Sequence, residues 1–196
     1  MEPNVIYNAL KRIMDVCISL PLMIIPLITY PIVWIAIKLE DKGPFFYKAE
    51  RIGERGVRIK MSKIRSMSVM DEGNQLGQHA NKITKVGKLV RVSRLDEFAQ
   101  LWSVLKGDLS LIGPRPEFPK LVELYIKEIP HYNVRHLIKP GLSGWAQIHH
   151  EKPPHSVEET VDKLSYDLYY IKHRSFMLDI KIALQTIKTL LSRVGV

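Results

Sequence analysis

A run of 25 residues, Ile13 to Ile37, is almost wholly apolar, and this run limits what the chain can fold into more than any other feature. Only Asp15, Ser19 and Thr29 interrupt it with polar side chains. At about 1.5 Å per residue, a helix of this length matches the roughly 30 Å hydrocarbon layer of a bilayer. The run exceeds the apolar core of a signal peptide, and no cleavage site of small residues follows it. We therefore predict a membrane element.

Two topologies remain open for this element: a straight span and a re-entrant hairpin. Cationic side chains flank the run on both sides: Lys11, Arg12, Lys38, Lys42, Lys48 and Arg51. Because cationic flanks tend to stay in the cytoplasm, this pattern favours placing both ends there. Pro21, Pro26 and Pro31 each remove a backbone donor and can bend the helix. The sequence slightly favours the re-entrant form.

The overall charge points to an anionic partner. The net charge is +9, and the single cysteine, Cys17, allows no intrachain disulfide and indicates a reducing compartment. A chain of 196 residues is long enough for one domain with a moderate core. Nucleic acid and an anionic membrane surface both fit the charge. No Cys/His cluster has zinc spacing, and no glycine-rich phosphate loop is present.

The stretch Ser93 to Pro116, SRLDEFAQLWSVLKGDLSLIGPRP, contains the residues best suited to chemistry. Ser93 is a candidate N-cap, and Asp96 follows three residues later, as in a capping box. Apolar side chains then recur at helical spacing, at Phe98, Leu101, Trp102 and Leu105. On this interpretation a helix starts at Ser93, and the acids only stabilise its first turn.

A second interpretation assigns chemistry to the same residues. The adjacent carboxylates of Asp96 and Glu97 can hold a divalent cation and still leave an oxygen free to act as nucleophile or base. A helix start would keep a carboxylate ionised and offer N–H groups to phosphate oxygens. Arg115 lies between Pro114 and Pro116, and its guanidinium is suited to bidentate phosphate binding. Together these features indicate phosphoryl chemistry.

The run LDEFAQLWSVLKGDLSLIGPRP also resembles the signature of the bacterial sugar transferase family, the monotopic phosphoglycosyl transferases. The small members of that family consist of this core alone, which a length of 196 residues fits. The resemblance covers nearly all of the chain, since it extends to KRIMD (Lys11 to Asp15), KIRSM (Lys63 to Met67), KPGLSGWAQI (Lys139 to Ile148) and DLYYIKHRSFMLDIKI (Asp167 to Ile182).

The resemblance implies an enzyme of the bacterial inner membrane, with its active site facing the cytoplasm. Its reaction would move a sugar-1-phosphate from a UDP-sugar to a polyprenol phosphate such as undecaprenyl phosphate. Asp96 would attack the sugar-side phosphorus and release UMP, and the polyprenol phosphate would then attack the phosphosugar-aspartyl intermediate. Mg²⁺ would be the cofactor, with Asp96 and Glu97 as its ligands, and Glu97 would bind the metal or assist proton transfer.

The resemblance also supplies candidate substrate-binding residues. Arg115 would clamp a phosphate, and the segment 139–147 would help to form the nucleotide-sugar site. The usual Asn-Gly-Arg continuation of that segment is replaced here by His149-His150-Glu151, which leaves the sugar open. The substrate-binding candidates are Lys63, Arg65, Arg94, Arg115, Trp145 and Gln147.

The expected fold is α+β and mostly helical: a monotopic membrane protein with a small β-hairpin and interfacial amphipathic helices, among them 176–193. Residues 1–42 would form the re-entrant membrane helix and its flanks, and 43–196 the cytoplasmic catalytic domain. Family members usually carry a Ser-Pro pair at the bend of this helix. The equivalent place here is near Ile28-Thr29, so we expect Pro26 or Pro31 to supply the bend.

A competing hypothesis is a membrane-anchored basic binding module without catalysis. It explains the charge and the apolar run, but it gives no reason for an acidic pair followed by Arg115. The favoured interpretation expects anionic lipid of the cytoplasmic leaflet as a partner and no nucleic acid. The oligomeric state stays open.

Overall fold

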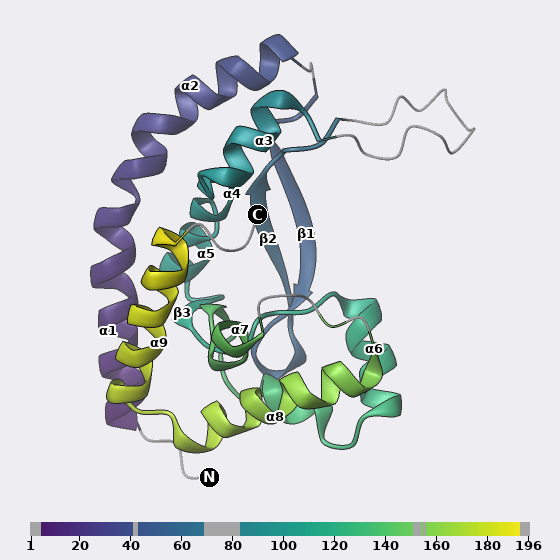
Figure 1. The fold of residues 1–196 in the computed structure, drawn as a ribbon. Coiled ribbons are helices and arrows are strands. Elements are labelled where there is room, and N and C mark those ends of the chain that lie inside the picture. Colours follow the sequence, from purple (N-terminus) through teal and green to yellow (C-terminus); the bar gives the residue numbers. More distant parts are fainter. Residues whose placement is uncertain (1–4, 41–42, 69–82, 151–153, 155, 193–196) are drawn as a thin grey trace, which may run out of the picture.

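A computed structural model describes residues 5–40, 43–68, 83–150, 154 and 156–192 (Figure 1). The α+β, mostly helical class is confirmed. In these segments four short strands form two two-stranded sheets, β1 (Phe46–Ile52) with β2 (Arg58–Ile64) and β3 (Ser110–Ile112) with β4 (Gly141–Ser143). The α-helices are α1 (Val5–Leu22), α2 (Ile24–Glu40), α3 (Lys85–Val92), α4 (Leu95–Phe98), α5 (Leu101–Lys106), α6 (Pro119–Glu128), α7 (Trp145–His149), α8 (Val157–His173) and α9 (Phe176–Leu191). Two 3-10 helices, η1 (Glu54–Gly56) and η2 (Tyr132–His136), complete the described elements.

The apolar run forms two helices, α1 and α2, which meet at Met23 with a bend of 43°. Within the described segments, no single helix is both long and apolar enough to cross a membrane. The bent pair passes that test only when its two helices are taken together, by length and composition.

The position of the bend points to Pro26. A proline cannot donate to the carbonyl four residues earlier, and its ring crowds that carbonyl. For Pro26 this carbonyl belongs to Leu22, the last residue of α1 before the break. Pro31 lies inside the uninterrupted helix α2. Of the two prolines expected to bend the element, Pro26 therefore fits the observed break.

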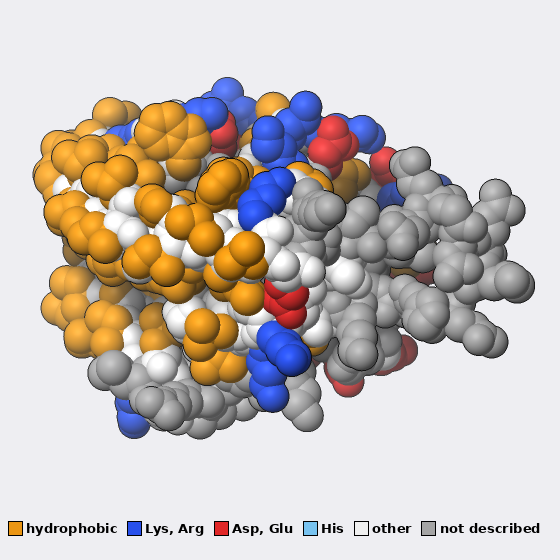
Figure 2. All heavy atoms as spheres, turned by 90° about the horizontal axis from the view of Figure 1, so that it is seen from above, with side chains coloured by type: hydrophobic (Ala, Val, Ile, Leu, Met, Phe, Trp, Pro, Cys, Tyr) orange, Lys and Arg blue, Asp and Glu red, His pale blue; other side chains and the backbone are white. Residues whose placement is uncertain are grey.

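One side of the molecule is strongly apolar. Figure 2 shows hydrophobic side chains gathered on the side where α1, α2 and α9 lie in Figure 1. Leu27 is 76 % exposed and Met177 is 76 % exposed, although both are large apolar side chains. The other exposed members on these helices include Val5, Ile6, Leu10, Ile13, Leu20, Ile24, Ile28, Ile32, Ile35, Leu39, Ile180, Leu184, Ile187 and Leu190. A continuous surface of this kind marks an interaction face.

The sequence predicts a hairpin of two short strands, Phe45 to Lys48 and Val57 to Met61; the hairpin is confirmed, and both strands are longer than this. β1 pairs antiparallel with β2 in a register that places Tyr47 opposite Lys63 and Ile52 opposite Arg58. The turn η1 contains Arg55 in the left-handed region, at φ 56°.

Pro140, Gly141 and Gly144 predict a tight-turned loop for the segment 139–147, but it contains a strand and the start of a helix. β4 pairs in parallel with β3, and α7 follows at once. A Cβ on Gly141 would lie 2.1 Å from the backbone nitrogen of Gly113, and one on Gly144 would lie 2.3 Å from the Gly113 carbonyl oxygen. The glycines therefore permit close backbone approach.

The prediction that a helix starts at Ser93 is wrong. Ser93 ends α3, and its hydroxyl donates to the Leu89 carbonyl at 2.8 Å. Thr84 caps the start of α3, where its hydroxyl accepts the Gly87 N–H at 2.9 Å, and the helix that carries Asp96 begins at Leu95 without a side-chain cap. Arg94 then adopts a left-handed conformation, and the expected single helix is split into α4 and α5.

Helical periodicity predicts helices from Glu117 to Ile129, from Val157 to Tyr170 and from Phe176 to Arg193, and the later helices lie close to these positions. The helix expected from Glu117 begins at Pro119, because proline suits the first helical turn. α8 continues past Tyr170 to His173, and α9 matches the segment expected from Phe176. Residue 193, the expected end of that segment, lies outside the described residues.

Two side chains of the KRIMD motif fix α1 to the protein. The Arg12 guanidinium donates to the carbonyls of Val104 and Leu105, at 2.5 and 2.6 Å, at the end of α5. The buried Asp15 carboxylate accepts the Leu111 N–H of β3 at 3.0 Å.

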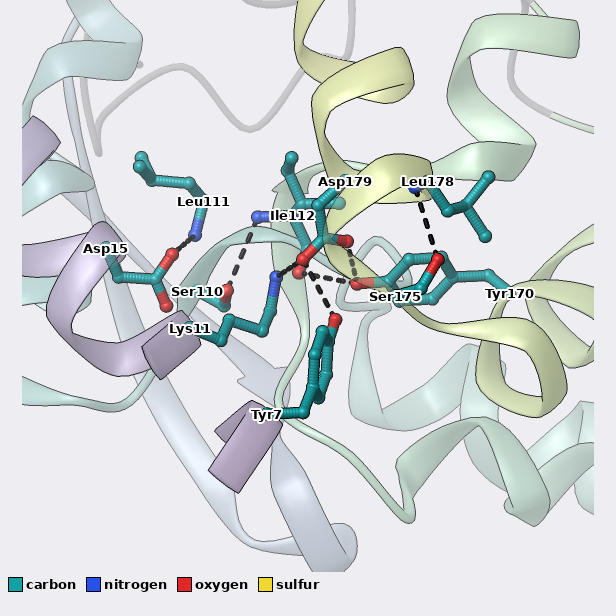
Figure 3. Close-up of polar contacts among 10 residues, drawn as sticks. All are labelled: Tyr7, Lys11, Asp15, Ser110, Leu111, Ile112, Tyr170, Ser175, Leu178 and Asp179. Atoms are coloured by element: carbon teal, nitrogen blue, oxygen red, sulfur yellow. Dashed lines mark hydrogen bonds and ion pairs between the residues drawn. The ribbon is translucent and has the colours of Figure 1, made fainter. Parts of the chain in front are cut away.

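Asp179 of α9 is the second attachment point of α1. Figure 3 shows Tyr7, Lys11 and Tyr170 converging on its carboxylate. The Lys11 ammonium lies 2.8 Å from Asp179, and the hydroxyls of Tyr7 and Tyr170 donate to it at 2.9 and 2.7 Å. Because Asp179 is 1 % exposed, this cluster ties α1, α8 and α9 together inside the protein.

Candidate active site

The acidic pair lies on the four-residue helix α4, directly after the left-handed Arg94. The Lys63 ammonium, from β2, lies 3.9 Å from Asp96 Oδ2 and 3.7 Å from Glu97 Oε1. The Arg94 guanidinium lies 3.8 Å from Glu97 Oε2. The structure therefore brings two of the predicted substrate-binding cations, Lys63 and Arg94, to the two carboxylates.

Asp96 and Glu97 differ in their surroundings. The Asp96 side chain is 14 % exposed, whereas that of Glu97 is 39 % exposed. Burial raises the pKa of Asp96 above its ordinary value; the Lys63 charge lowers that pKa and the Glu97 charge raises it. Asp96 is thus the less hydrated carboxylate, and Lys63 favours its ionised form.

The start of α4 stabilises the ionised form of Asp96 less than the sequence suggested. With only four residues, α4 has little aligned dipole to offer. The neighbouring cation Lys63 is the clearer source of stabilisation for the carboxylate.

Tyr30 connects the bent helix pair to the acidic pair, a contact that the sequence did not predict. Its hydroxyl donates to the Leu95 carbonyl at 3.1 Å, one residue before Asp96. Its ring packs edge-on against Phe45 and Phe46, with centroids 5.6 and 6.1 Å away. Tyr30 thereby fixes α4 relative to α2.

The backbone of Arg115 is held by a buried ion pair. Arg135 donates to the Arg115 carbonyl at 2.9 Å and to Asp167 at 2.7 Å. Arg135 and Asp167 are 4 % and 2 % exposed. Gly141 also donates to the Pro114 carbonyl at 2.9 Å. The Arg115 side chain remains exposed and can reach a ligand.

A small cavity of about 40 Å³ joins Arg115 to Lys63. Arg51 also lines the cavity, so three cationic side chains face it. Its full lining consists of Tyr47, Ala49, Arg51, Met61, Lys63, Gln100, Arg115, Pro116 and Gly141. The three cationic side chains are suited to bind phosphate oxygens, and the two neighbouring carboxylates are suited to bind a metal cation.

Arg51 was not among the predicted binding residues. Its guanidinium carbon lies 3.2 Å from the centre of the Phe118 ring. The signal that identifies it is strand alternation, since Tyr47, Ala49 and Arg51 occupy every second position of β1.

Of the six predicted binding residues only Lys63 and Arg115 line this cavity; Arg94, Arg65, Trp145 and Gln147 do not. Arg65 is 8 % exposed, and its backbone N–H donates to the Phe45 carbonyl at 2.9 Å. Trp145 stacks on Tyr169 with ring centroids 5.8 Å apart. Gln147 donates to the Leu142 carbonyl at 3.0 Å and so supports β4, whose Gly141 does line the cavity.

The acidic pair fits a hard divalent cation. Among the described residues, no group of three or more His, Cys, Asp or Glu side chains forms a metal cluster. The two carboxylates nevertheless both approach one cation, the Lys63 ammonium. Mg²⁺ is commonly bound by one or two carboxylates together with substrate phosphates, which matches this donor set.

Comparison with known proteins places the chain in a family. A family model described as bacterial sugar transferase matches residues 6–193. A UDP-N-acetylgalactosamine-undecaprenyl-phosphate N-acetylgalactosaminephosphotransferase of Aeromonas hydrophila is 41% identical over 98% of this chain and 46% of its own length. A UDP-glucose:undecaprenyl-phosphate glucose-1-phosphate transferase of Caulobacter vibrioides is 34% identical, over 97% of this chain and 73% of its own length.

The share of a relative's length that this chain spans differs from one relative to the next. The chain spans 46%, 40% and 39% of the relatives from Aeromonas hydrophila, Klebsiella pneumoniae and Escherichia coli, which is less than half of each. An uncharacterized sugar transferase of Bacillus subtilis, 34% identical, is covered over 90% of its length. Because the family model matches almost the whole sequence, the chain belongs to the bacterial sugar transferase family.

Proposed function

We propose that this protein transfers a sugar-1-phosphate from a UDP-sugar to undecaprenyl phosphate, with Asp96 as the nucleophile. The observation that carries the proposal is the Lys63 ammonium between two adjacent carboxylates, beside a cavity that Arg115 shares. The relatives from Aeromonas hydrophila and Caulobacter vibrioides are named for transfers of this class.

In the first step an Asp96 carboxylate oxygen attacks the sugar-side phosphorus of the UDP-sugar. A new O–P bond forms, the bond to the bridging diphosphate oxygen breaks, and UMP leaves with the electron pair. Asp96 is suited to this role because it is poorly solvated and has fewer torsions to fix than Glu97. Arg115 and Arg51 face the cavity in which the phosphates would bind.

In the second step a phosphate oxygen of undecaprenyl phosphate attacks the same phosphorus. The Asp96 O–P bond breaks, the carboxylate is regenerated, and a diphosphate-linked lipid sugar forms. Mg²⁺ held by Asp96 and Glu97 would neutralise charge on the diphosphate and on the leaving UMP. Glu97, the more exposed carboxylate, would hold that ion or handle a proton.

In this proposal the bent helix pair places the active site at the membrane surface. Undecaprenyl phosphate keeps its tail in the bilayer and its phosphate at the surface. The apolar face of α1, α2 and α9 would enter the cytoplasmic leaflet of the bacterial inner membrane, with both ends of the bent pair on the cytoplasmic side. Tyr30 would then hold the acidic pair at the height of the lipid phosphate.

The competing function, a basic binding module without catalysis, leaves the acidic pair and its shared lysine unexplained. Incubating the detergent-solubilised protein with UDP-sugars and undecaprenyl phosphate separates the two functions, because only the transferase releases UMP. The relatives named above differ in their sugar, so a panel containing UDP-glucose and UDP-N-acetylgalactosamine is required.

The first prediction distinguishes Asp96 from Glu97. Asp96→Asn removes the attacking oxygen, so UMP release should fall roughly a thousandfold or more and no covalent adduct should form. Glu97→Gln keeps the nucleophile, so turnover should fall about a hundredfold while the adduct still forms. Peptide mass spectrometry after mixing with UDP-sugar alone locates the adduct. A phosphosugar on Glu97 would overturn the assignment.

The second prediction concerns pH. Burial raises the pKa of Asp96 and Lys63 lowers it, so Lys63→Gln should raise that pKa further. Because the ionised carboxylate is the nucleophile, the acidic limb of single-turnover UMP release should move to higher pH. Lys60→Gln, an exposed change on the same strand, is the matched control and should leave the limb in place. Identical profiles for both variants would contradict the proposed coupling.

The third prediction concerns the metal. Thorough chelation of divalent cations should stop turnover, and Mg²⁺ should restore it, because two carboxylates face a diphosphate. A zinc-selective chelator should have little effect, since carboxylates and phosphates are hard ligands. Full turnover after chelation would remove the metal from the proposal.

The fourth prediction concerns topology. In a Cys17→Ser background, single cysteines at Asn4 and Asp41, which flank the bent pair, should resist an impermeant thiol reagent in intact cells. Both should react once the inner membrane is permeabilised, which is the control for reactivity. Labelling of either position from the periplasmic side would establish a straight span and exclude the re-entrant form.

A further inference from the structure

A second cavity, of about 250 Å³, lies at the junction of α1, the hairpin turn η1, β3, the segment before β4, and the end of α8. It shares no lining residue with the cavity beside the acidic pair. The feature that distinguishes it is charge, because its walls include five cationic side chains: Lys11, Arg12, Arg55, Lys139 and Arg174.

Two of these cations already have protein partners. Lys11 pairs with Asp179, and Arg12 donates to the two carbonyls at the end of α5. The lining contains two carboxylates, Asp15 and Glu54, and Asp15 is already bound to a backbone N–H of β3. Five cations therefore face two acids across this cavity.

The other three cations are available to a ligand. Within the part of the chain that the structure describes, no ion pair or hydrogen bond to protein involves Arg55, Lys139 or Arg174. Arg174 has one weaker contact, since its guanidinium carbon lies 5.5 Å from the centre of the Tyr7 ring. Arg55 is held in the left-handed region, where a residue other than glycine is strained. Like charges gathered around a hollow repel one another, and a bound anion relieves that repulsion.

We propose that this cavity is a second anion site, which binds a phosphate group independently of the acidic pair. Guanidinium and ammonium groups from separate elements can surround phosphate oxygens with charge-assisted hydrogen bonds. α1 lines the cavity and also exposes the apolar side chains of Val5, Ile6 and Leu10, so an anionic lipid headgroup is one source of such a phosphate. A soluble phosphate compound presents the same chemistry. The inference does not depend on the proposed transfer reaction.

The test uses the full chain in detergent with Lys63→Gln and Arg115→Gln, which weakens phosphate binding beside the acidic pair. In this background inorganic phosphate should still raise the thermal unfolding midpoint relative to chloride at equal ionic strength. Adding Arg55→Gln and Lys139→Gln should weaken the phosphate affinity roughly tenfold or more. Adding Lys120→Gln and Lys127→Gln, an equal loss of charge on exposed positions of α6, should leave it unchanged.

Two results overturn the proposal. If phosphate raises the midpoint in no variant, the cavity does not bind it. If the Arg55/Lys139 and Lys120/Lys127 variants respond alike, any stabilisation reflects overall charge and not this cavity. Unfolding midpoints measured in chloride alone confirm that neither pair of substitutions damages the fold.

Vesicles identify the source of the phosphate once the first test succeeds. Binding of the same variants is compared on phosphatidylcholine vesicles with and without phosphatidylglycerol. If a lipid headgroup is the ligand, Arg55→Gln/Lys139→Gln should lose more affinity for phosphatidylglycerol vesicles than the α6 control. Equal affinities of the two variants would instead assign the cavity to a soluble phosphate compound.

Discussion

The Lys63 ammonium between Asp96 and Glu97 is the interaction on which the candidate site depends. It joins β2 to α4, two elements separated by more than thirty positions along the chain. Without this cation, two adjacent carboxylates would repel each other, and the less exposed Asp96 would favour its protonated form. The same cation marks the place where both carboxylates converge, which is where the proposal puts the nucleophile and the metal ligand.

Buried polar contacts hold the elements around this centre. Arg135 and Asp167 form an ion pair that also binds the Arg115 carbonyl, and Asp179 collects side chains from α1 and α8. Removing one partner of a buried pair leaves an uncompensated charge and typically costs about 3–5 kcal/mol. These contacts therefore fix the positions of the Arg115 backbone and of α1. Substitution of their buried partners is expected to destabilise the fold.

Local patterns in the sequence predicted much of the fold. Two short extended runs around the turn Gly53 to Gly56 identified the hairpin, and helical periodicity identified α6, α8 and α9. The prediction failed at two places, the β3–β4 pair and Ser93, and each failure has a physical reason. β3 and β4 have three residues each, too few for a pattern, and depend on close backbone approach at Gly113 and Gly141. Ser93 can cap a helix start or end one; here its hydroxyl donates to the Leu89 carbonyl at the end of α3, and the left-handed Arg94 separates α3 from α4.

The candidate site was predicted only in part from the sequence. The motif around Asp96 identified the carboxylates and Arg115, because these residues are close in sequence. Arg51 joins them only after β1 and β2 pair, and Tyr30 joins them only after α2 packs against α4. Trp145 and Gln147 share a motif with Gly141, yet only Gly141 lines the cavity beside Lys63. Motif membership alone does not tell which side chains reach a ligand.

The central claim is that transfer proceeds in two steps through Asp96. Isotope exchange tests it most directly: the enzyme is incubated with a UDP-sugar that it uses and with labelled UMP, and undecaprenyl phosphate is omitted. A reversible first step predicts that label enters the UDP-sugar, and that Asp96→Asn abolishes this exchange. Absence of exchange from an enzyme that turns over normally once undecaprenyl phosphate is added would contradict the account, because it would indicate direct transfer between the two substrates.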